Sequence, residues 1–542
     1  MHFVPARAGR RRTSRAGTSG TSRRRAGRTR TVRATAVRGL AVGVCSLAVL
    51  AGCTSAPLPP VLQSQPAESA EPRESAPAGL QRFYDQKLAW QDCDGSFECA
   101  DLTVPRDYAD PEAGTTTIAL LRAKGDKPQG SLVVNPGGPG GSGVDYARAA
   151  GQILSDTVTE QYSVVGFDPR GVGRSAPIDC LTDAELDEWI ALDGEPDSQQ
   201  EQQELLDAAR DFGKACEERS AQMLPYVDTE SVVKDLDILR AALGERRLNY
   251  LGFSYGTMIG ALYADRFGPK TGRMVLDGAL PPQLTIDEIG LGQAKGFDKA
   301  LRRYVEDCQT KSDCPVAGES VDEGVRKVQD FLDSLDEQPL PAGDGRELNQ
   351  GLGAGAVLYH LYFPFAGDWD SLSDGLRDAF AGDGRRLLDM FYERLERSPD
   401  GKYANNSQEV FYAVTCLDRG SDADIEKLRR QADEWAQEAP VFGRYLAWTE
   451  AACSEWPVAA TGEPEEVTAA DAGPILVIGN TNDPATPLEW AQLLADRLAD
   501  AHLIVWESDG HTAYGNGSSC VDDAVDAYLV DGELPPADLV CR

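Results

Sequence analysis

Short apolar runs alternate with helix-like segments in two separate parts of the chain. In the first part, the pattern predicts strands over residues 100–104, 116–121, 131–135, 162–167, 248–252 and 273–276. In the second part, it predicts a strand over 474–479, a helix over 488–499 and a strand over 502–506. Strands that alternate with helices are typical of α/β proteins, so we predict a mostly parallel sheet.

The segment between these two parts has a different pattern, with helical spacing and few strand-like runs. Helices are expected over residues 287–307, 320–335, 353–363, 369–380, 385–397, 406–417 and 422–439. Because the strand and helix alternation resumes afterwards, we predict that a helical cap over 283–465 interrupts one sheet domain formed by 81–282 and 466–542. A chain of 542 residues is long enough for two such folded parts.

The N-terminal region indicates export. Residues 1–38 hold twelve Arg and no acidic residue, and an uncharged, mainly apolar run of fourteen residues follows over 39–52. That run is too short to span a membrane, so we predict a signal peptide over 1–52. Residues 53–80 are rich in Pro, Ala and Ser, which favours a flexible linker.

The signal peptide ends in Leu50-Ala51-Gly52-Cys53, which resembles the lipobox of bacterial lipoproteins. The resemblance implies lipid attachment at Cys53 and a position on the outer face of the cell membrane. Ordinary secretion with cleavage nearby is the alternative. The long basic region also leaves open a later start codon or export by a twin-arginine route.

Charge and cysteine content narrow the function classes. Of 53 basic residues, twelve lie in 1–38, so the rest of the chain has 41 against 87 acidic residues. Such an acidic chain repels nucleic acid. Ten cysteines follow Cys53, and local closure predicts the disulfides Cys93–Cys99, Cys180–Cys216, Cys308–Cys314, Cys416–Cys453 and Cys520–Cys541. We expect no metal site, because the chain has no Cys-x-x-Cys pair and four His.

The strongest candidate for chemistry is Gly252-x-Ser254-x-Gly256, which lies between a predicted strand and a predicted helix. A sharp turn from strand to helix with Ser at its tip is the setting of a nucleophile elbow. A Gly-Ser turn that merely joins the strand to the helix is the alternative. Ser254 is therefore the candidate nucleophile.

A serine nucleophile needs a base that is held by an acid. His511 follows the last strand in a polar loop, whereas His502 begins that strand and is expected to be structural. Asp483 follows the strand over 474–479 and is the candidate acid, with Asp277 as its rival; Asp509 is too close to His511 in the sequence. The order Ser, acid, His is that of α/β-hydrolases.

The oxyanion of the reaction needs two backbone N–H donors. One is expected from Tyr255, which follows the nucleophile. The other is expected from the Gly-rich loop after the strand over 131–135, where Pro136 and Pro139 have no N–H and Gly137 and Gly138 remain. A phosphate loop is excluded, because its Lys and Ser/Thr are missing.

Several motifs occur together and in order: Asn135-Pro-Gly-Gly-Pro-Gly, Asp168-Pro-Arg-Gly-x-Gly-x-Ser175, Gly252-Phe-Ser-Tyr-Gly-Thr257, Asp483-x-x-Thr486-Pro487 and Gly510-His511. Over residues 83–541 they resemble the secreted tripeptidyl aminopeptidases and prolyl aminopeptidase-like serine exopeptidases of the α/β-hydrolase superfamily. The resemblance implies an α/β-hydrolase fold with a helical cap, the triad Ser254, Asp483 and His511, and oxyanion donors Gly138 and Tyr255.

The same resemblance implies release of short peptides, expected to be tripeptides, from free N-termini of peptides or proteins, without metal or organic cofactor. An aminopeptidase must also bind the α-ammonium, and Asp418 in the predicted cap is the candidate. We expect a monomer that meets the membrane only through its lipid. The alternatives are an esterase with the same triad and a non-catalytic peptide-binding lipoprotein.

Overall fold

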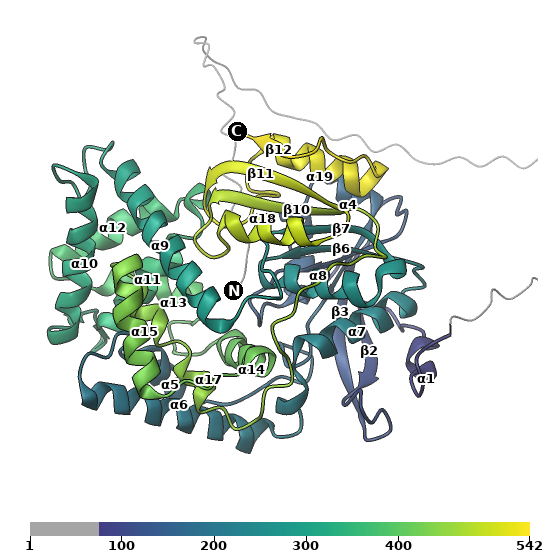
Figure 1. The fold of residues 1–542 in the computed structure, drawn as a ribbon, viewed down its shortest axis with the longest axis horizontal. Helices are drawn as coiled ribbons and strands as arrows, with labels where there is room; N and C mark the ends of the chain where they lie inside the picture. The colour runs from purple at the N-terminus through teal and green to yellow at the C-terminus, as the bar shows by residue number, and fades with distance from the viewer. Residues whose placement is uncertain (1–74) are drawn as a thin grey trace, which may run out of the picture. The chain divides into compact units, whose positions relative to one another are not determined.

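A ten-stranded sheet forms the centre of the structure, a computed structural model that describes residues 75–542 (Figure 1). The strands lie in the order β1-β2-β3-β5-β4-β6-β7-β10-β11-β12. Their bounds are β1 Gln91–Cys93, β2 Phe97–Pro105, β3 Thr115–Ala123, β4 Ser131–Asn135, β5 Ser163–Phe167, β6 Leu248–Phe253, β7 Thr271–Asp277, β10 Ile475–Asn482, β11 Ala501–Asp509 and β12 Leu539–Cys541. The predicted signal peptide, Cys53 and most of the predicted linker lie outside the described residues.

Seven neighbouring strands, from β5 to β12 in the sheet order, pair in parallel, and the three strands at the β1 edge pair antiparallel. Every residue of β4 and of β5 is buried. Burial on both faces is the reason that these strands are continuously apolar in sequence instead of alternating. The prediction of a mostly parallel sheet is confirmed.

Helices cover both faces of the sheet. One face packs against α1 Gln81–Tyr84, α7 Thr229–Ala242, α8 Tyr255–Arg266 and α18 Leu488–Arg497. The other face packs against α2 Gly143–Arg148, α3 Ala150–Ile153, α4 Asp156–Gln161 and α19 Ser519–Asp531. Successive residues of β10 point to opposite faces, since Val477 packs on the first side and Leu476 and Ile478 on the second.

A layer of helices lies beside the sheet domain in Figure 1. It contains α9 Ile286–Cys308, α10 Val321–Glu337, α11 Gln350–His360, α12 Asp368–Phe380, α13 Arg385–Arg394, α14 Ser407–Arg419, α15 Ile425–Glu438, α16 Gly443–Ala447, α17 Ala451–Ser454 and the hairpin β8 Leu340–Pro341 and β9 Glu347–Leu348. Short 3-10 turns occupy Leu224–Tyr226, Gly268–Lys270 and Pro364–Ala366. Helix α14 also contributes Val410, Ala413, Val414 and Leu417 to the core of the sheet domain, so it packs against both parts.

Two helices from before residue 283 pack on this helical layer. Helices α5 Asp183–Ile190 and α6 Gln199–Ser220 lie next to it in Figure 1. The guanidinium of Arg397 binds Asp187 at 2.5 Å, and Arg429 donates to Gln202 at 2.6 Å. The long connection from β5 to α7 therefore supplies part of the layer, which the helical spacing over 283–465 did not reveal.

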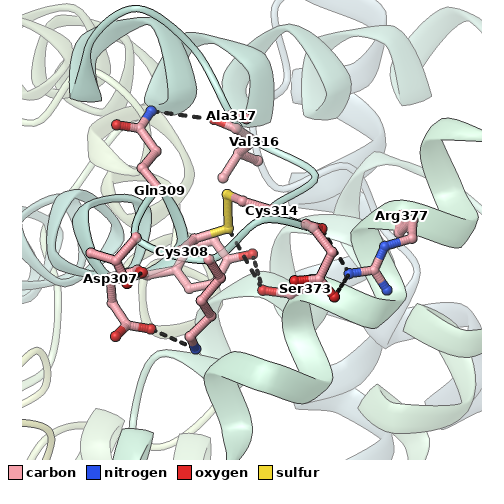
Figure 2. Close-up of a disulfide and its surroundings, with 12 residues drawn as sticks. Asp307, Cys308, Gln309, Cys314, Val316, Ala317, Ser373 and Arg377 are labelled. Atoms are coloured by element: carbon pink, nitrogen blue, oxygen red, sulfur yellow. Dashed lines mark hydrogen bonds and ion pairs between the residues drawn. A yellow bond between two sulfur atoms is a disulfide. The ribbon is translucent and has the colours of Figure 1, made fainter.

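Five disulfides lie within residues 75–542, and they join the ten cysteines as local closure predicts. Figure 2 shows the Cys308–Cys314 disulfide at the end of α9. There Ser373 of α12 donates to the sulfur of Cys308, and Arg377 of α12 donates to the carbonyl oxygen of Asp313 at 3.0 Å. This disulfide and these two hydrogen bonds hold the turn after α9 against α12.

Within residues 75–542, none of the helices has the length and apolar character that a membrane crossing requires.

The five disulfides should not stabilise the protein equally. Cys180–Cys216 encloses a separation of 36 residues and Cys93–Cys99 a separation of six. Because the loss of chain entropy in the unfolded state grows with loop length, replacing the first pair by Ala should lower the free energy of unfolding by about 4 kcal/mol and replacing the second by about 2 kcal/mol. Urea denaturation of both double variants measures the difference; equal losses would contradict it.

Candidate active site

A strained turn presents Ser254 between β6 and α8. Its φ is 53° and its ψ is −125°, a conformation that costs a side-chain-bearing residue on the order of 1–3 kcal/mol and that is concentrated at functional sites. A Cβ on Gly252 would lie 2.4 Å from the carbonyl oxygen of Gly256, and one on Gly256 would lie 2.8 Å from the carbonyl oxygen of Asn135. The two glycines of the motif are thus required by the close approach of β4, β6 and α8.

The Gly-rich loop after β4 lies directly against this turn. Gly137 has a φ of +89°, and a Cβ there would lie 2.4 Å from the carbonyl oxygen of Phe253 and 3.0 Å from the backbone nitrogen of Tyr255. The N–H of Gly137 donates to the side chain of Asn135 at 2.9 Å. That bond occupies the Gly137 donor, and so of the two glycines considered in the sequence the geometry favours Gly138 as the loop donor.

His511 and Asp483 form the ion-pair geometry of a base and its acid. The Nδ1 atom of His511 lies 2.9 Å from both carboxylate oxygens of Asp483, and both side chains are fully buried. Asp483 also accepts the N–H groups of Ala485 and Thr486 and the hydroxyl of Thr486 at 3.0 Å. These bonds fix the carboxylate, and the carboxylate in turn fixes the orientation of the imidazole ring.

The rival acid has a different position. The carboxylate of Asp277 accepts the N–H groups of Ala513 and Tyr514 at 2.8 to 3.0 Å, while its carbonyl oxygen accepts the N–H of Ser254 at 2.9 Å. Burial raises the pKa of Asp277 to about 7. Asp277 therefore holds the loop of His511 next to the turn of Ser254, and Asp483 is the residue that binds the His511 ring.

The remaining alternatives lie elsewhere. Asp509 binds Arg303 at 2.8 Å and accepts the amide of Asn482, so it joins β10 and β11 to α9. His502 lies near the start of β11, 3.7 Å from Asp500. Since the base candidate follows the other end of that strand, His502 is too far along β11 to belong to the same group.

Sequence reasoning missed the contact of the helical layer with the base. The carbonyl oxygen of Tyr362, just after α11, accepts the N–H of His511 at 2.8 Å, and the ring of Tyr362 stands edge-on to the imidazole at 5.6 Å. The ring of Phe363 lies beside the rings of Tyr362 and His511, and the ring of Phe365 lies beside that of Phe363. A Cβ on Gly510 would lie 2.8 Å from Phe365. The aromatic run over 359–365 was the available signal, but helical spacing alone does not show which element it contacts.

A cavity of about 320 Å³ lies in front of Ser254. It is lined by Gly138, Pro139, Ser254, Ile286, Ile289, Gly290, Gln293, Phe297, Leu358, Tyr359, Tyr362, Ser407, Gln408, Phe411, Tyr412, Thr415, Leu446, Thr449, Cys453 and Ala485. The lining is mainly apolar and aromatic, and none of these residues carries a charge. Most of them belong to the helical layer, so this layer shapes the space that a substrate would occupy.

Asp418, the residue predicted to bind the substrate ammonium, is not among the lining residues of this cavity. It is buried in α14, where its carboxylate accepts the backbone N–H of Thr229 at 2.8 Å and the Thr229 hydroxyl at 2.5 Å. Burial raises the pKa of Asp418 to about 6. With both oxygens committed to the start of α7, Asp418 joins the helical layer to the sheet domain, and we do not carry its predicted role further.

The sheet order, the strained Ser between strand and helix, and the buried Asp and His at the ends of the next strands define an α/β-hydrolase fold. The protein is a serine hydrolase of this fold. The comparisons then give its family: the chain belongs to the tripeptidyl aminopeptidase-like serine exopeptidases, the family that the motifs predicted.

Three relatives and one family description support this assignment. Residues 439–541 match the family described as TAP-like protein. The chain is 36% identical to serine protease Hip1 of Mycobacterium tuberculosis over 82% of its length and 88% of the relative. It is 34% identical to carboxylesterase B of the same species, over 82% and 86% of the two chains. It is 32% identical to tripeptidyl aminopeptidase of Streptomyces lividans, over 84% and 86%.

The raised pKa of Asp277 makes its contribution to stability depend on pH. An ordinary Asp has a pKa near 3.9 when exposed, so the folded protein retains a proton that the unfolded chain releases between about pH 4 and pH 7. The contribution is therefore fully present below about pH 4 and is lost as the pH rises through 7. The free energy of unfolding of the wild type minus that of Asp277→Asn should fall over this interval.

Urea denaturation of both proteins at pH 4.5, 6 and 7.5 measures this difference. Asp500→Asn, which removes an exposed carboxylate next to His502, is the control and should show no comparable trend. A difference between wild type and Asp277→Asn that rises with pH would contradict the assignment.

Proposed function

We propose that Ser254, His511 and Asp483 are the catalytic triad of an acyl-transfer reaction. The Oγ of Ser254 attacks the scissile carbonyl carbon while Nε2 of His511 accepts its proton. Asp483 holds Nδ1 of His511 and stabilises the imidazolium that forms. His511 then protonates the leaving group, and a water molecule activated by the same ring releases the acyl group from Ser254. The reaction needs no metal or organic cofactor.

The N–H groups of Gly138 and Tyr255 are the proposed donors to the oxyanion. The closeness of Gly137 to Tyr255 supports this assignment: a Cβ on Gly137 would lie 3.0 Å from the backbone nitrogen of Tyr255, so the loop after β4 lies beside the first turn of α8. Tyr255 also begins α8, so its N–H lies at the positive end of the helix dipole. A developing negative charge at this point would meet donors that are already oriented.

The proposed substrates are peptides or proteins with a free N-terminus, from which short peptides, in particular tripeptides, are released. The observation that carries this proposal is the limited cavity of about 320 Å³ in front of Ser254, roofed by the helical layer. A tripeptide in extended conformation is about 10 Å long, so a cavity of limited volume can restrict how far a chain extends beyond the nucleophile. The names of the relatives, serine protease and tripeptidyl aminopeptidase, agree with this proposal.

An esterase is the second candidate. One relative is named carboxylesterase B, and the cavity lining carries no charge, which would suit an apolar acyl chain as well as a peptide. The same triad would serve both reactions. The requirement for a free substrate amine separates the two candidates.

A non-catalytic peptide-binding lipoprotein is the third candidate function, and it would require no reactive Ser254.

We further propose that the protein works outside the cytoplasm as a monomer, held at the membrane by lipid on Cys53. The Arg-rich region, the apolar run and the lipobox-like end of residues 1–53 support export and anchoring. The five disulfides fit an oxidising compartment. The net charge of −34 makes a nucleic acid partner unfavourable.

The kcat/KM for an alanine tripeptide p-nitroanilide with a free amine should exceed the kcat/KM for its N-acetylated form by at least tenfold. It should also exceed the kcat/KM for p-nitrophenyl butyrate when each value is divided by the uncatalysed rate of the same substrate. Ser254→Ala should lower kcat for the free tripeptide by about a thousandfold or more, because the nucleophile is lost. Mass spectrometry of longer peptides shows where the first cut falls.

Thr257→Ser is the control for the nucleophile, because it changes a side chain of the same turn but keeps the hydroxyl that donates to the carbonyl oxygen of Ser254, and it should retain most of the activity. An enzyme that prefers the acetylated peptide or the butyrate ester would be an esterase or an endopeptidase. If a serine-reactive phosphonate fails to label Ser254 in the folded protein, both enzymatic candidates are wrong.

A further inference from the structure

A second cavity adjoins the one in front of Ser254. It has a volume of about 250 Å³ and shares the lining residues Leu358, Gln408, Tyr412, Leu446 and Thr449 with the first cavity. Its other lining residues come from α5, α6 and the segment between them, from α11 and α13, and from α16, α17 and the turn between them. The two cavities therefore lie on either side of the same few side chains within the helical layer.

The two cavities differ in charge. The first cavity has no charged lining residue, whereas the second has one, Asp193, in the segment between α5 and α6. The carboxylate of Asp193 accepts the backbone N–H of Glu195 at 2.8 Å. Among the described residues, no Lys or Arg forms an ion pair with it that the structure records within 4.0 Å. Asp193 thus places an uncompensated negative charge at the wall of the second cavity.

The surroundings increase this negative potential. Carboxylate oxygens of Asp193, Glu201 and Asp336 lie within 4.8 Å of one another. Burial raises the pKa of Asp193 to about 6 and that of Glu195 to about 7, and neighbouring carboxylates add to both shifts. Arg444 lies 3.4 Å from Glu195 and compensates that residue in part. A cation in the second cavity would relieve the repulsion.

An unpartnered polar group points to the same place. The side chain of Tyr445 lines the second cavity and is 93% buried, and its hydroxyl makes no hydrogen bond within the described residues. Burial, together with the negative charges of Glu195, Asp333 and Asp193, raises the pKa of Tyr445. A buried hydroxyl without a partner destabilises the fold, and a donor from a ligand would offset this cost.

Aromatic rings complete the lining. Trp189, Tyr412 and Trp448 line the second cavity together with Asp193 and Tyr445. Aromatic faces attract cations within about 6 Å, and this adds to the attraction of a carboxylate. A carboxylate, an unpartnered hydroxyl and aromatic rings at the end of an otherwise apolar space are suited to an alkylammonium group on a chain that is itself largely apolar.

We propose that the second cavity binds the α-ammonium group of the peptide substrate, with Asp193 as the counter-charge and the Tyr445 hydroxyl as a hydrogen-bond acceptor. The inference rests on the function proposed above and assigns the recognition of the free N-terminus to residues that the sequence did not single out. The peptide then runs from the second cavity past Gln408 and Thr449 to Ser254. The separation between Asp193 and Ser254 sets how many residues are released.

Asp193→Asn tests the proposal, because it removes the charge and keeps the shape of the side chain. We expect kcat/KM for the free alanine tripeptide p-nitroanilide to fall at least tenfold, mainly through KM. The ratio of kcat/KM for the free tripeptide to that for its N-acetylated form should fall by the same factor. Tyr445→Phe should lower the same ratio about threefold or more, since it removes only the hydroxyl.

Asp197→Asn is the matched control. Asp197 lies in the same segment and carries the same charge, but it is exposed and does not line the cavity. A twofold change or less in this variant supports a local role of Asp193. An equal loss in both variants would mean that only the general negative field matters, and it would overturn the proposal. Thermal unfolding of each variant shows whether it remains folded.

Three further outcomes decide whether the inference and the proposed function hold. If the wild type prefers the free tripeptide and Asp193→Asn keeps the full preference, the inference is wrong and the proposed function stands. If the wild type has no preference, the proposed function itself is wrong.

The three carboxylates of Asp193, Glu201 and Asp336 could instead hold a divalent cation. A rise of Tm in 5 mM CaCl₂ that disappears in Asp193→Asn would assign the site to a metal ion and overturn the ammonium site.

Discussion

The position of Asp277 is the constraint on which the active site depends. Through its carbonyl oxygen it holds the N–H of Ser254, and through its carboxylate it holds the N–H groups of Ala513 and Tyr514. These segments lie more than 200 residues apart in the chain, with helices α9 to α17 between them. One buried residue at the end of β7 thus fixes the nucleophile turn relative to the loop of the base, and the burial cost of its carboxylate is offset by two backbone donors.

In the proposed function, reaction chemistry and substrate recognition come from different parts of the molecule. The sheet domain supplies the strained Ser254, the Asp483–His511 pair and the Gly-rich loop, all at the carboxyl ends of adjacent strands. The helical layer supplies most of the cavity lining and also contacts the base through Tyr362. Since a serine site of this kind can hydrolyse an ester or an amide, the proposal assigns the choice of substrate to the helical layer.

The acidic composition has two consequences inside the fold. Buried carboxylates that accept several backbone or hydroxyl donors, such as Asp277 and Asp418, act as connectors between segments. Carboxylates that crowd together, such as Asp193, Glu201 and Asp336, repel one another instead, and this repulsion adds to the burial that raises the pKa of Asp193. Net charge alone does not distinguish these roles, because the distinction depends on which donors lie within hydrogen-bonding distance.

The sequence by itself determined the sheet, the elbow and the three candidate catalytic residues. Continuous apolar runs indicate strands buried on both faces, and glycines two residues on either side of Ser254 indicate a turn without room for side chains. Local closure was also sufficient for the five disulfides. These features depend on neighbours in the chain, and their signals are therefore local. The triad assignment rested in addition on the order of motifs.

Only the tertiary structure decided the contacts between distant segments. It distinguished Asp483 from Asp277 at His511, favoured Gly138 over Gly137 through the bond of Gly137 to Asn135, and placed Asp418 against Thr229 instead of the cavity. It also added α5 and α6 to the helical layer and brought Asp193 to a cavity wall. Helical spacing shows that a helix has a buried face, but the partner of that face is set by packing across the fold.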